Sequence, residues 1–252
     1  MLQLLEAACE NTDLRAHVVH ENDVSGHRPG TDTAEVRITL DSSVGSDRLE
    51  QRVIRFAPGR SLPQQLENLQ GIFYVVSGQG SLETDSQRHD LEPEAGAYLR
   101  PGDHFVIDNP GPEELVAVLV TTWPPDGRLA VPDPRVVRYG DRPPLPAGKD
   151  REFRYLVHRD TGSPDVTQFI GTIPPGRAPD HSHVYDEVIY VLDGRGSLHV
   201  EGRSFPIQAG SCLHLPPLLE HAVENAGDTP MRVLGVFHPS GDPASRAYEA
   251  ND

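Results

Sequence analysis

The chain repeats itself, and this repeat limits its possible folds more than any other feature. The segment IFYVVSGQGSL at residues 72–82 matches VIYVLDGRGSL at residues 188–198, an offset of 116 residues. The same offset of 116 relates NPG at 109–111 to NAG at 225–227, and PGR occurs both at 58–60 and at 175–177. A repeat of this length indicates two equivalent domains that share one chain path.

The repeated segments have the pattern of short β-strands. EVRITL, LEQRVIRFAPG and IFYVVSG are rich in β-branched and aromatic residues, and the first two alternate in character. The 24 prolines and 23 glycines suit many strands joined by tight turns rather than long helices. The sequence therefore predicts an all-β protein with two tandem β-domains.

The second repeat contains residue types that bind metal ions. His181, His183 and Glu187 occur in PPGRAPDHSHVYDEVIYVLDG at spacings i, i+2 and i+6. Side chains on a β-strand alternate between faces, so these even spacings place all three on one face. His221 follows 34 residues after Glu187 and can supply a fourth ligand from a neighbouring strand. Imidazoles and a carboxylate that converge in this way are ligands of divalent transition metals.

These stretches resemble the two motifs of the cupin family. HxHxxxE followed by Gly194 resembles the first motif, and the second is matched by Gly210, Pro216, His221 and Asn225. The resemblance implies a bicupin, with two tandem double-stranded β-helix (jelly-roll) barrels. It also implies one divalent transition metal ion per chain, Fe, Mn, Ni or Zn, held by His181, His183, Glu187 and His221. Two turn positions depart from the motifs, which have glycine in place of Pro175 and Leu218.

The first repeat lacks this ligand set. When the repeats are aligned on Gly78 and Gly194, the positions of His181, His183 and Glu187 are taken by Gln65, Glu67 and Gly71. Phe105 or His104 falls near the position of His221. Contact of Gln65, Glu67 or His104 with a metal stays open, but we expect the first barrel to be empty and to serve packing.

The repeat and the proline distribution give the expected domain limits. They are an N-terminal arm at 1–34, an N-terminal barrel with a degenerate site at 35–123, a linker or strap at 124–149, a metal-binding C-terminal barrel at 150–240 and a tail at 241–252. Residues 124–149 contain seven prolines, which disfavour helix and sheet interior. Within them VVRY is strand-like, so we favour a strap that pairs with a sheet edge.

Three further residues of the second repeat have two open interpretations. His199 and His214 lie on expected strands, where either can orient a metal ligand or carry a proton, or can be purely structural. Tyr185 shares the alternation phase of His183 and Glu187, so it lines the cavity or packs in the core. The histidines of the N-terminal arm are predicted to be solvated loop residues: His17, His20 and His27.

Composition argues against several partners and compartments. A net charge of −16 would repel phosphate backbones and anionic lipid, so we expect neither nucleic-acid nor membrane binding. No run approaches 18 apolar residues, and the N-terminus is too short and acidic for a secretory signal. The two cysteines, Cys9 and Cys212, indicate no disulfide framework, which favours a cytoplasmic protein. We expect it to be a monomer or a homodimer.

The predicted site suggests catalysis. An ion with open coordination positions can polarise a carbonyl or enolate, activate water, or bring substrate and dioxygen together. Glu187 either stays a ligand or acts catalytically by accepting a proton from the substrate. The first hypothesis is a metal-dependent dioxygenase that acts on a small enolisable or phenolic compound. A decarboxylase, isomerase or hydrolase stays open, as does a non-catalytic cupin that binds or senses a small acid or sugar.

Overall fold

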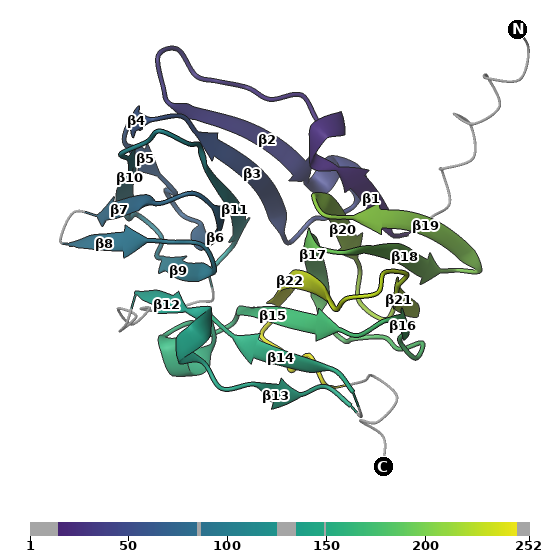
Figure 1. The fold of residues 1–252 in the computed structure, drawn as a ribbon. Coiled ribbons are helices and arrows are strands. Elements are labelled where there is room, and N and C mark those ends of the chain that lie inside the picture. Colours follow the sequence, from purple (N-terminus) through teal and green to yellow (C-terminus); the bar gives the residue numbers. More distant parts are fainter. Residues whose placement is uncertain (1–14, 85–86, 125–134, 149, 246–252) are drawn as a thin grey trace, which may run out of the picture.

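The chain forms two β-barrels that correspond to the two sequence repeats (Figure 1). The computed structural model describes residues 15–84, 87–124, 135–148 and 150–245. The predicted all-β class with two tandem barrels is confirmed. The expected arm, strap and tail lie partly outside the described residues, and the exact domain limits stay a prediction.

The first barrel consists of a six-stranded and a five-stranded sheet. The six-stranded sheet has the order β12-β9-β6-β11-β3-β2; in the five-stranded sheet the order is β4-β10-β7-β8, and β5 also pairs with β10. The strands are β2 (Ala34–Leu40), β3 (Glu50–Phe56), β4 (Gly59–Arg60), β5 (Gln64–Gln65), β6 (Gln70–Ser77), β7 (Gly80–Thr84), β8 (Arg88–Leu91), β9 (Ala95–Leu99), β10 (His104–Asn109), β11 (Leu115–Thr122) and β12 (Val136–Arg138).

The second barrel consists of a seven-stranded and a four-stranded sheet. Their orders are β1-β20-β17-β22-β15-β14-β13 and β16-β21-β18-β19. The strands are β1 (His17–His20), β13 (Leu145–Pro146), β14 (Glu152–Tyr155), β15 (Thr167–Ile173), β16 (Gly176–Arg177), β17 (Asp186–Asp193), β18 (Arg195–Val200), β19 (Arg203–Gln208), β20 (Ser211–Leu215), β21 (His221–Asn225) and β22 (Met231–His238). Short 3₁₀ turns occur at Glu21–Asp23, Ser42–Val44, Tyr139–Asp141 and Arg159–Thr161.

Each barrel receives an edge strand from a segment outside its own repeat. β1, from the N-terminal arm, pairs with β20 of the second barrel, with His17 opposite His214. β12, from the proline-rich segment, pairs with β9 of the first barrel, with Val137 opposite Gly96. The prediction that His17 and His20 are solvated loop residues is wrong, because β1 gains a ladder of backbone hydrogen bonds on β20. His27 forms an isolated bridge with Val36.

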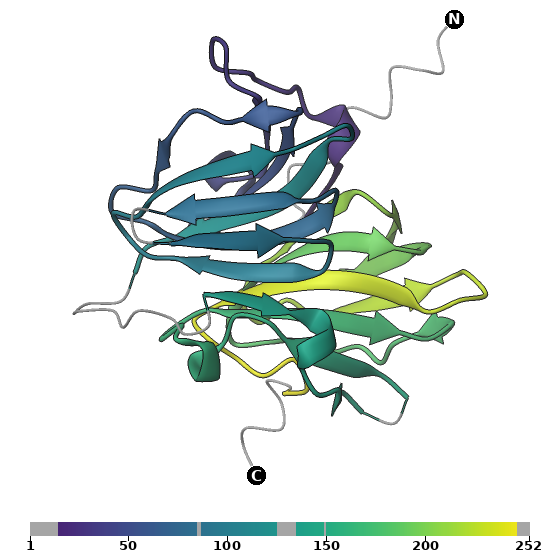
Figure 2. The ribbon, with the colours of Figure 1, turned by 60° about the vertical axis from the view of Figure 1, so that its left-hand side comes forward.

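Apolar residues fill both barrels and the space between them. One cluster, which includes Phe73 and Phe105, lies within the first barrel, and a second, which includes Leu198 and Leu213, lies within the second. A third cluster joins residues of both barrels, for example Tyr74 and Tyr190. Figure 2 shows the strands of the two barrels stacked one above the other. The barrels therefore share a core and support each other.

Strand β17 shows how this packing follows from sequence. Six of its residues, from Asp186 to Val191, are buried in succession, without the alternation of a half-exposed strand. Ile189 and Val191 belong to the cluster within the barrel, whereas Val188 and Tyr190 belong to the shared cluster. Both faces of β17 are covered, so a continuous apolar run is favourable there.

Across the described residues, none of the helices has the length and apolar character that a membrane crossing requires.

Candidate metal centre

Three histidines converge at one end of the second barrel. Each of His181, His183 and His221 offers one ring nitrogen, and these three atoms lie within 4.8 Å of one another. His181 and His221 face each other in an isolated antiparallel bridge with backbone hydrogen bonds of 3.0 and 2.9 Å. The expectation that His181, His183 and Glu187 lie on one strand is wrong, because β17 begins only at Asp186. A short extended segment before β17 carries the first two histidines instead.

Hydrogen bonds fix the orientation of all three rings. Nδ1 of His181 lies 3.0 Å from the carbonyl oxygen of Pro179, and Nδ1 of His221 lies 2.8 Å from that of Leu219. A carbonyl oxygen only accepts, so each Nδ1 carries the proton and the lone pair is on Nε2. Nδ1 of His183 lies 3.1 Å from the hydroxyl of Tyr185. Rings held in this tautomer present Nε2 to a metal ion.

Glu187 lies beside the histidines but is not part of their group. Its Oε2 is 3.9 Å from Nε2 of His221, and the residue is only 4% exposed. This Oε2 is buried without a hydrogen-bond partner. Burial, and secondarily the charge of Asp186, raises the pKa of Glu187 to about 8, whereas burial and His181 lower the pKa of His221 to about 4. A buried carboxylate without a partner is costly, and a cation in this place would remove that cost.

These pKa values predict proton release when a metal ion binds. At pH 7 the Glu187 carboxyl, with its pKa near 8, is mostly protonated in the metal-free protein. An ion that ligates the carboxylate displaces this proton, so Glu187→Gln should lower the release by about one proton per ion. Titration calorimetry in buffers of different ionisation enthalpy measures the difference. Equal proton release from both proteins would show that Glu187 does not contact the ion.

The histidines and Glu187 line a cavity of about 80 Å³. Most of its other lining is apolar, and Arg151 and Glu152 are the remaining charged residues among those that line it. Gly235 on β22 makes room for one wall, since a Cβ there would lie 2.3 Å from the Phe169 ring. The apolar lining includes Phe153, Phe169, Ile189, Val223, Val233 and Phe237.

The equivalent position in the first barrel is filled by apolar side chains. A Cβ on Gly71, the counterpart of Glu187, would lie 2.5 Å from Leu66 Cδ1 and 3.2 Å from Leu119 Cδ1. Phe105 is buried in the same cluster. Within the described parts of the chain, the histidines of the second barrel form the one group of three or more side chains placed to hold an ion. Leucine and phenylalanine side chains thus pack around the position that corresponds to Glu187, and the absence of an ion from the first barrel stays a prediction.

The two other candidate histidines, His214 and His199, lie outside the cavity. His214 lies 2.7 Å from the Asp186 carboxylate, and His199 lies 2.6 Å from that of Glu224. Neither histidine lines the cavity, so the structure gives them no contact with it.

Leu218, which replaces a motif glycine, has φ of 61° and donates its amide hydrogen to the His183 carbonyl at 2.7 Å. The turn therefore keeps the left-handed geometry that the glycine would supply.

Two features of the cavity were not predicted from the sequence. Arg151 and the phenylalanines reach the site from β14, β15, β22 and the segment before β14, all outside the cupin motifs. These side chains reach the cavity only because strands far apart in the chain pair with one another, and the sequence around each residue does not indicate that pairing.

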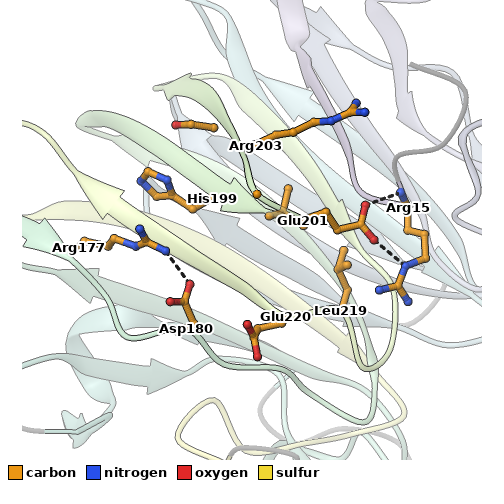
Figure 3. Close-up of a pocket in the computed structure, with 11 residues that line it drawn as sticks. Arg15, Arg177, Asp180, His199, Glu201, Arg203, Leu219 and Glu220 are labelled. Atoms are coloured by element: carbon orange, nitrogen blue, oxygen red, sulfur yellow. Dashed lines mark hydrogen bonds and ion pairs between the residues drawn. The ribbon is translucent and has the colours of Figure 1, made fainter. Parts of the chain in front are cut away.

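A second hollow lies on the outside of the same barrel (Figure 3). Its volume is about 390 Å³, and its lining includes Asp180 and Glu220, the neighbours of two of the site histidines. Arg15 forms an ion pair with Glu201 at 2.9 Å, and Arg177 forms one with Asp180 at 2.7 Å. Because these cations already pair with carboxylates in the hollow, the geometry favours the histidine cavity as the functional site.

Two jelly-roll barrels, one with converging histidines and a buried carboxylate, define the class of the protein. The profile of the cupin domain family matches residues 52–121 and, a second time, residues 169–237. The chain belongs to the cupin family, and its two matches make it a bicupin. Among curated proteins, it is similar to an oxalate-binding protein of Thermotoga maritima, with 35% identity over 67 residues, which are 26% of this chain and 55% of that protein. Such matches span about half the length of the curated relatives.

Solved structures show the same two-barrel arrangement. A putative glyoxylate induced protein from Pseudomonas aeruginosa superimposes with a TM-score of 0.77 at 20% identity, covering 90% of each chain. A variant of Bacillus subtilis oxalate decarboxylase gives a TM-score of 0.72 at 16% identity, covering 89% of this chain and 77% of the other. At sequence identities this low, the structural similarity shows the fold alone, and the activity has to be inferred from the residues of the site.

Proposed function

We propose that the second barrel binds one divalent transition metal ion and that the protein is a metal-dependent dioxygenase for a small enolisable or phenolic compound. The observation that carries this proposal is the convergence of three ring nitrogens beside a buried carboxylate oxygen without a hydrogen-bond partner. His181, His183, Glu187 and His221 would hold the ion. When bound, it would supply Lewis acidity toward a substrate oxygen and, if it is redox-active, a path for electrons between substrate and dioxygen.

The protein residues account for binding and for the exclusion of water. The rings of Phe153, Phe169 and Phe237 pack against one another and give the cavity an apolar wall, against which a planar substrate would lie. Arg151 lines the same cavity and places a guanidinium group where it attracts an enolate, phenolate or carboxylate. The apolar walls keep water from a reactive anion and strengthen its attraction to positive charge.

Glu187 is the residue best placed to move a proton. Its Oε2 lies on the cavity beside His221, and burial raises the pKa of this carboxyl to about 8. A base with a pKa near the working pH is effective in proton transfer. A Glu187 carboxylate that is released from the ion would therefore take, through Oε2, the proton that leaves a phenol hydroxyl or the carbon next to a carbonyl; while it stays a ligand, it takes no proton.

The proposed activity predicts oxygen consumption that depends on both metal and substrate. The protein is reconstituted without oxygen with Fe(II), Mn(II), Ni(II) or Zn(II), and oxygen uptake is followed with catechols, enols and 1,3-dicarbonyls. We expect uptake with at least one redox-active ion and none with Zn(II). Release of carbon dioxide or ammonia from a small acid without oxygen uptake would instead identify a decarboxylase or hydrolase.

A second candidate function is the binding of a small acid without turnover. The similarity to an oxalate-binding protein favours it, as does the position of Arg151 at the cavity. Titration of the metal-loaded protein with oxalate distinguishes the two functions. Stoichiometric binding, with no product from any compound in the panel, would replace the dioxygenase proposal by this one.

A further inference from the structure

Beyond β22 the chain turns back over the metal cavity. Residues 240–245, called the gate segment here, contribute Pro243 to the lining of the cavity. Pro243, Ala244 and Ser245 also line a neighbouring hollow of about 290 Å³, together with Gly148. Both spaces share four lining residues: Ala147, Arg151, His181 and Pro243. The gate segment therefore lies at the boundary between the inner cavity and the outer hollow.

A few polar contacts hold the gate segment in place. At its start, the Thr167 hydroxyl on β15 lies 2.7 Å from the Ser240 hydroxyl and accepts a hydrogen bond from the Gly241 amide at 3.2 Å. Further along, the Tyr185 hydroxyl donates to the Asp242 carbonyl at 2.6 Å and lies 3.0 Å from the Ser245 hydroxyl. The gate segment belongs to no strand, so these contacts replace a sheet ladder. Segments held in this way open more easily than the sheets around them.

Tyr185 contacts the gate segment and a site histidine at the same time. Its ring stacks on the His183 ring, with centroids 4.9 Å apart and an interplanar angle of 14°. Gly241 lies directly against the same tyrosine, since a Cβ there would be 2.1 Å from its Cε1. The hydroxyl has one proton, which goes to the Asp242 carbonyl, so toward Nδ1 of His183 it is the acceptor.

We propose that residues 240–245 form a gate over the metal cavity and that Tyr185 is the positioning residue that couples this gate to His183. While the gate is closed, the Tyr185 hydroxyl donates a hydrogen bond to the Asp242 carbonyl. This orients the hydroxyl so that its oxygen accepts a hydrogen bond from Nδ1–H of His183. Once the gate opens, the hydroxyl loses the Asp242 acceptor and its own proton is free to turn toward His183, which weakens its hydrogen bond with Nδ1 of His183. Closure thus completes the metal site, an inference that rests on the proposed metal-binding function.

The test compares two tyrosine variants with Co(II) as the probe ion. Tyr185→Phe keeps the stacked ring but removes the hydroxyl, so the Kd for Co(II) should rise about 10- to 100-fold. Amide hydrogen exchange at Gly241 and Ser245 should also accelerate in the metal-free protein. Tyr155 lies against the Asp242 carboxylate; burial, and secondarily the charge of this carboxylate and the hydrogen bond to it, raise the pKa of Tyr155 to about 12. Tyr155→Phe should loosen the gate but keep the Tyr185 hydroxyl, so Co(II) should enter and leave faster and its Kd should rise by less than in Tyr185→Phe.

Tyr190→Phe is the matched control. Tyr190 is a buried tyrosine like Tyr185, but it lies on β17 and packs in the cluster shared by the two barrels. This variant should leave the Kd and the exchange of residues 240–245 unchanged. The gate inference is overturned if Tyr185→Phe changes neither quantity while the wild type binds one ion. If the wild type binds no ion, the proposed function fails, and unaltered exchange in Tyr185→Phe would then overturn the gate as well.

Discussion

Replacing His183 with alanine should abolish tight metal binding. The wild type is expected to bind one ion per chain and, at an ion concentration of about 100 times Kd, to gain about 2.7 kcal/mol of stability. For a chain of this size, that gain corresponds to a rise in Tm of about 5–10 °C. Loss of a ligand should weaken binding by more than the 10- to 100-fold typical for the loss of an outer hydrogen-bond partner. Equilibrium dialysis and thermal melts with and without the ion measure both effects.

His199→Ala controls for the loss of a histidine from the same barrel. His199 pairs with Glu224 on β21 and does not line the cavity, so this variant should bind the ion as the wild type does. A full equivalent of tightly bound metal in His183→Ala would show that the ligand assignment is wrong. Two equivalents in the wild type would contradict the expectation that the leucine-filled first barrel is empty.

Removal of residues 1–123 should make the remaining chain aggregate. Burial of each large apolar side chain contributes about 1.5–3 kcal/mol to the stability of the fold. Nine buried residues of the cluster shared by the two barrels come from the second barrel. Exposing them to water would cost about as much as the whole stability of a typical domain, about 5–15 kcal/mol, or more. The residues exposed would be Leu156, Val157, Val166, Ile170, Val188, Tyr190, Cys212, Leu234 and Val236.

The deletion also leaves a sheet edge without its partner. β1 is removed, so the apolar strand β20 (Ser211–Leu215) would present unpaired backbone groups to solvent. Size-exclusion chromatography of the fragment 124–252 measures the outcome, and co-expression of residues 1–123 as a separate chain should restore solubility. A monomeric fragment that binds metal on its own would show that the barrels fold independently.

The sequence by itself determined the two-barrel fold and indicated which residue types come together in the second barrel. The repeat at an offset of 116 residues and the strand-like segments predicted two tandem β-domains, and the resemblance to the cupin motifs implied that these domains are barrels, as the structure shows. The spacing of His181, His183 and Glu187 predicted that these side chains approach one another. The structure brings the three histidines together with Glu187 beside them, while the ligand set itself stays a prediction.

Only the tertiary structure decided what surrounds these residues. Strand β1 was read as loop because its pairing with β20, nearly 200 residues away, leaves no local pattern. The phenylalanines and Arg151 reach the cavity only once β14, β15 and β22 are paired, and Pro243 does so only once the chain turns back after β22. Tyr185 had two open interpretations in the sequence, and the structure favours the second: it packs with Phe169 and Phe237 in a core cluster and is not among the residues that line the cavity. Local spacing indicated which residue types come together, whereas the cavity walls and the contacts of residues 240–245 depend on pairing between distant segments.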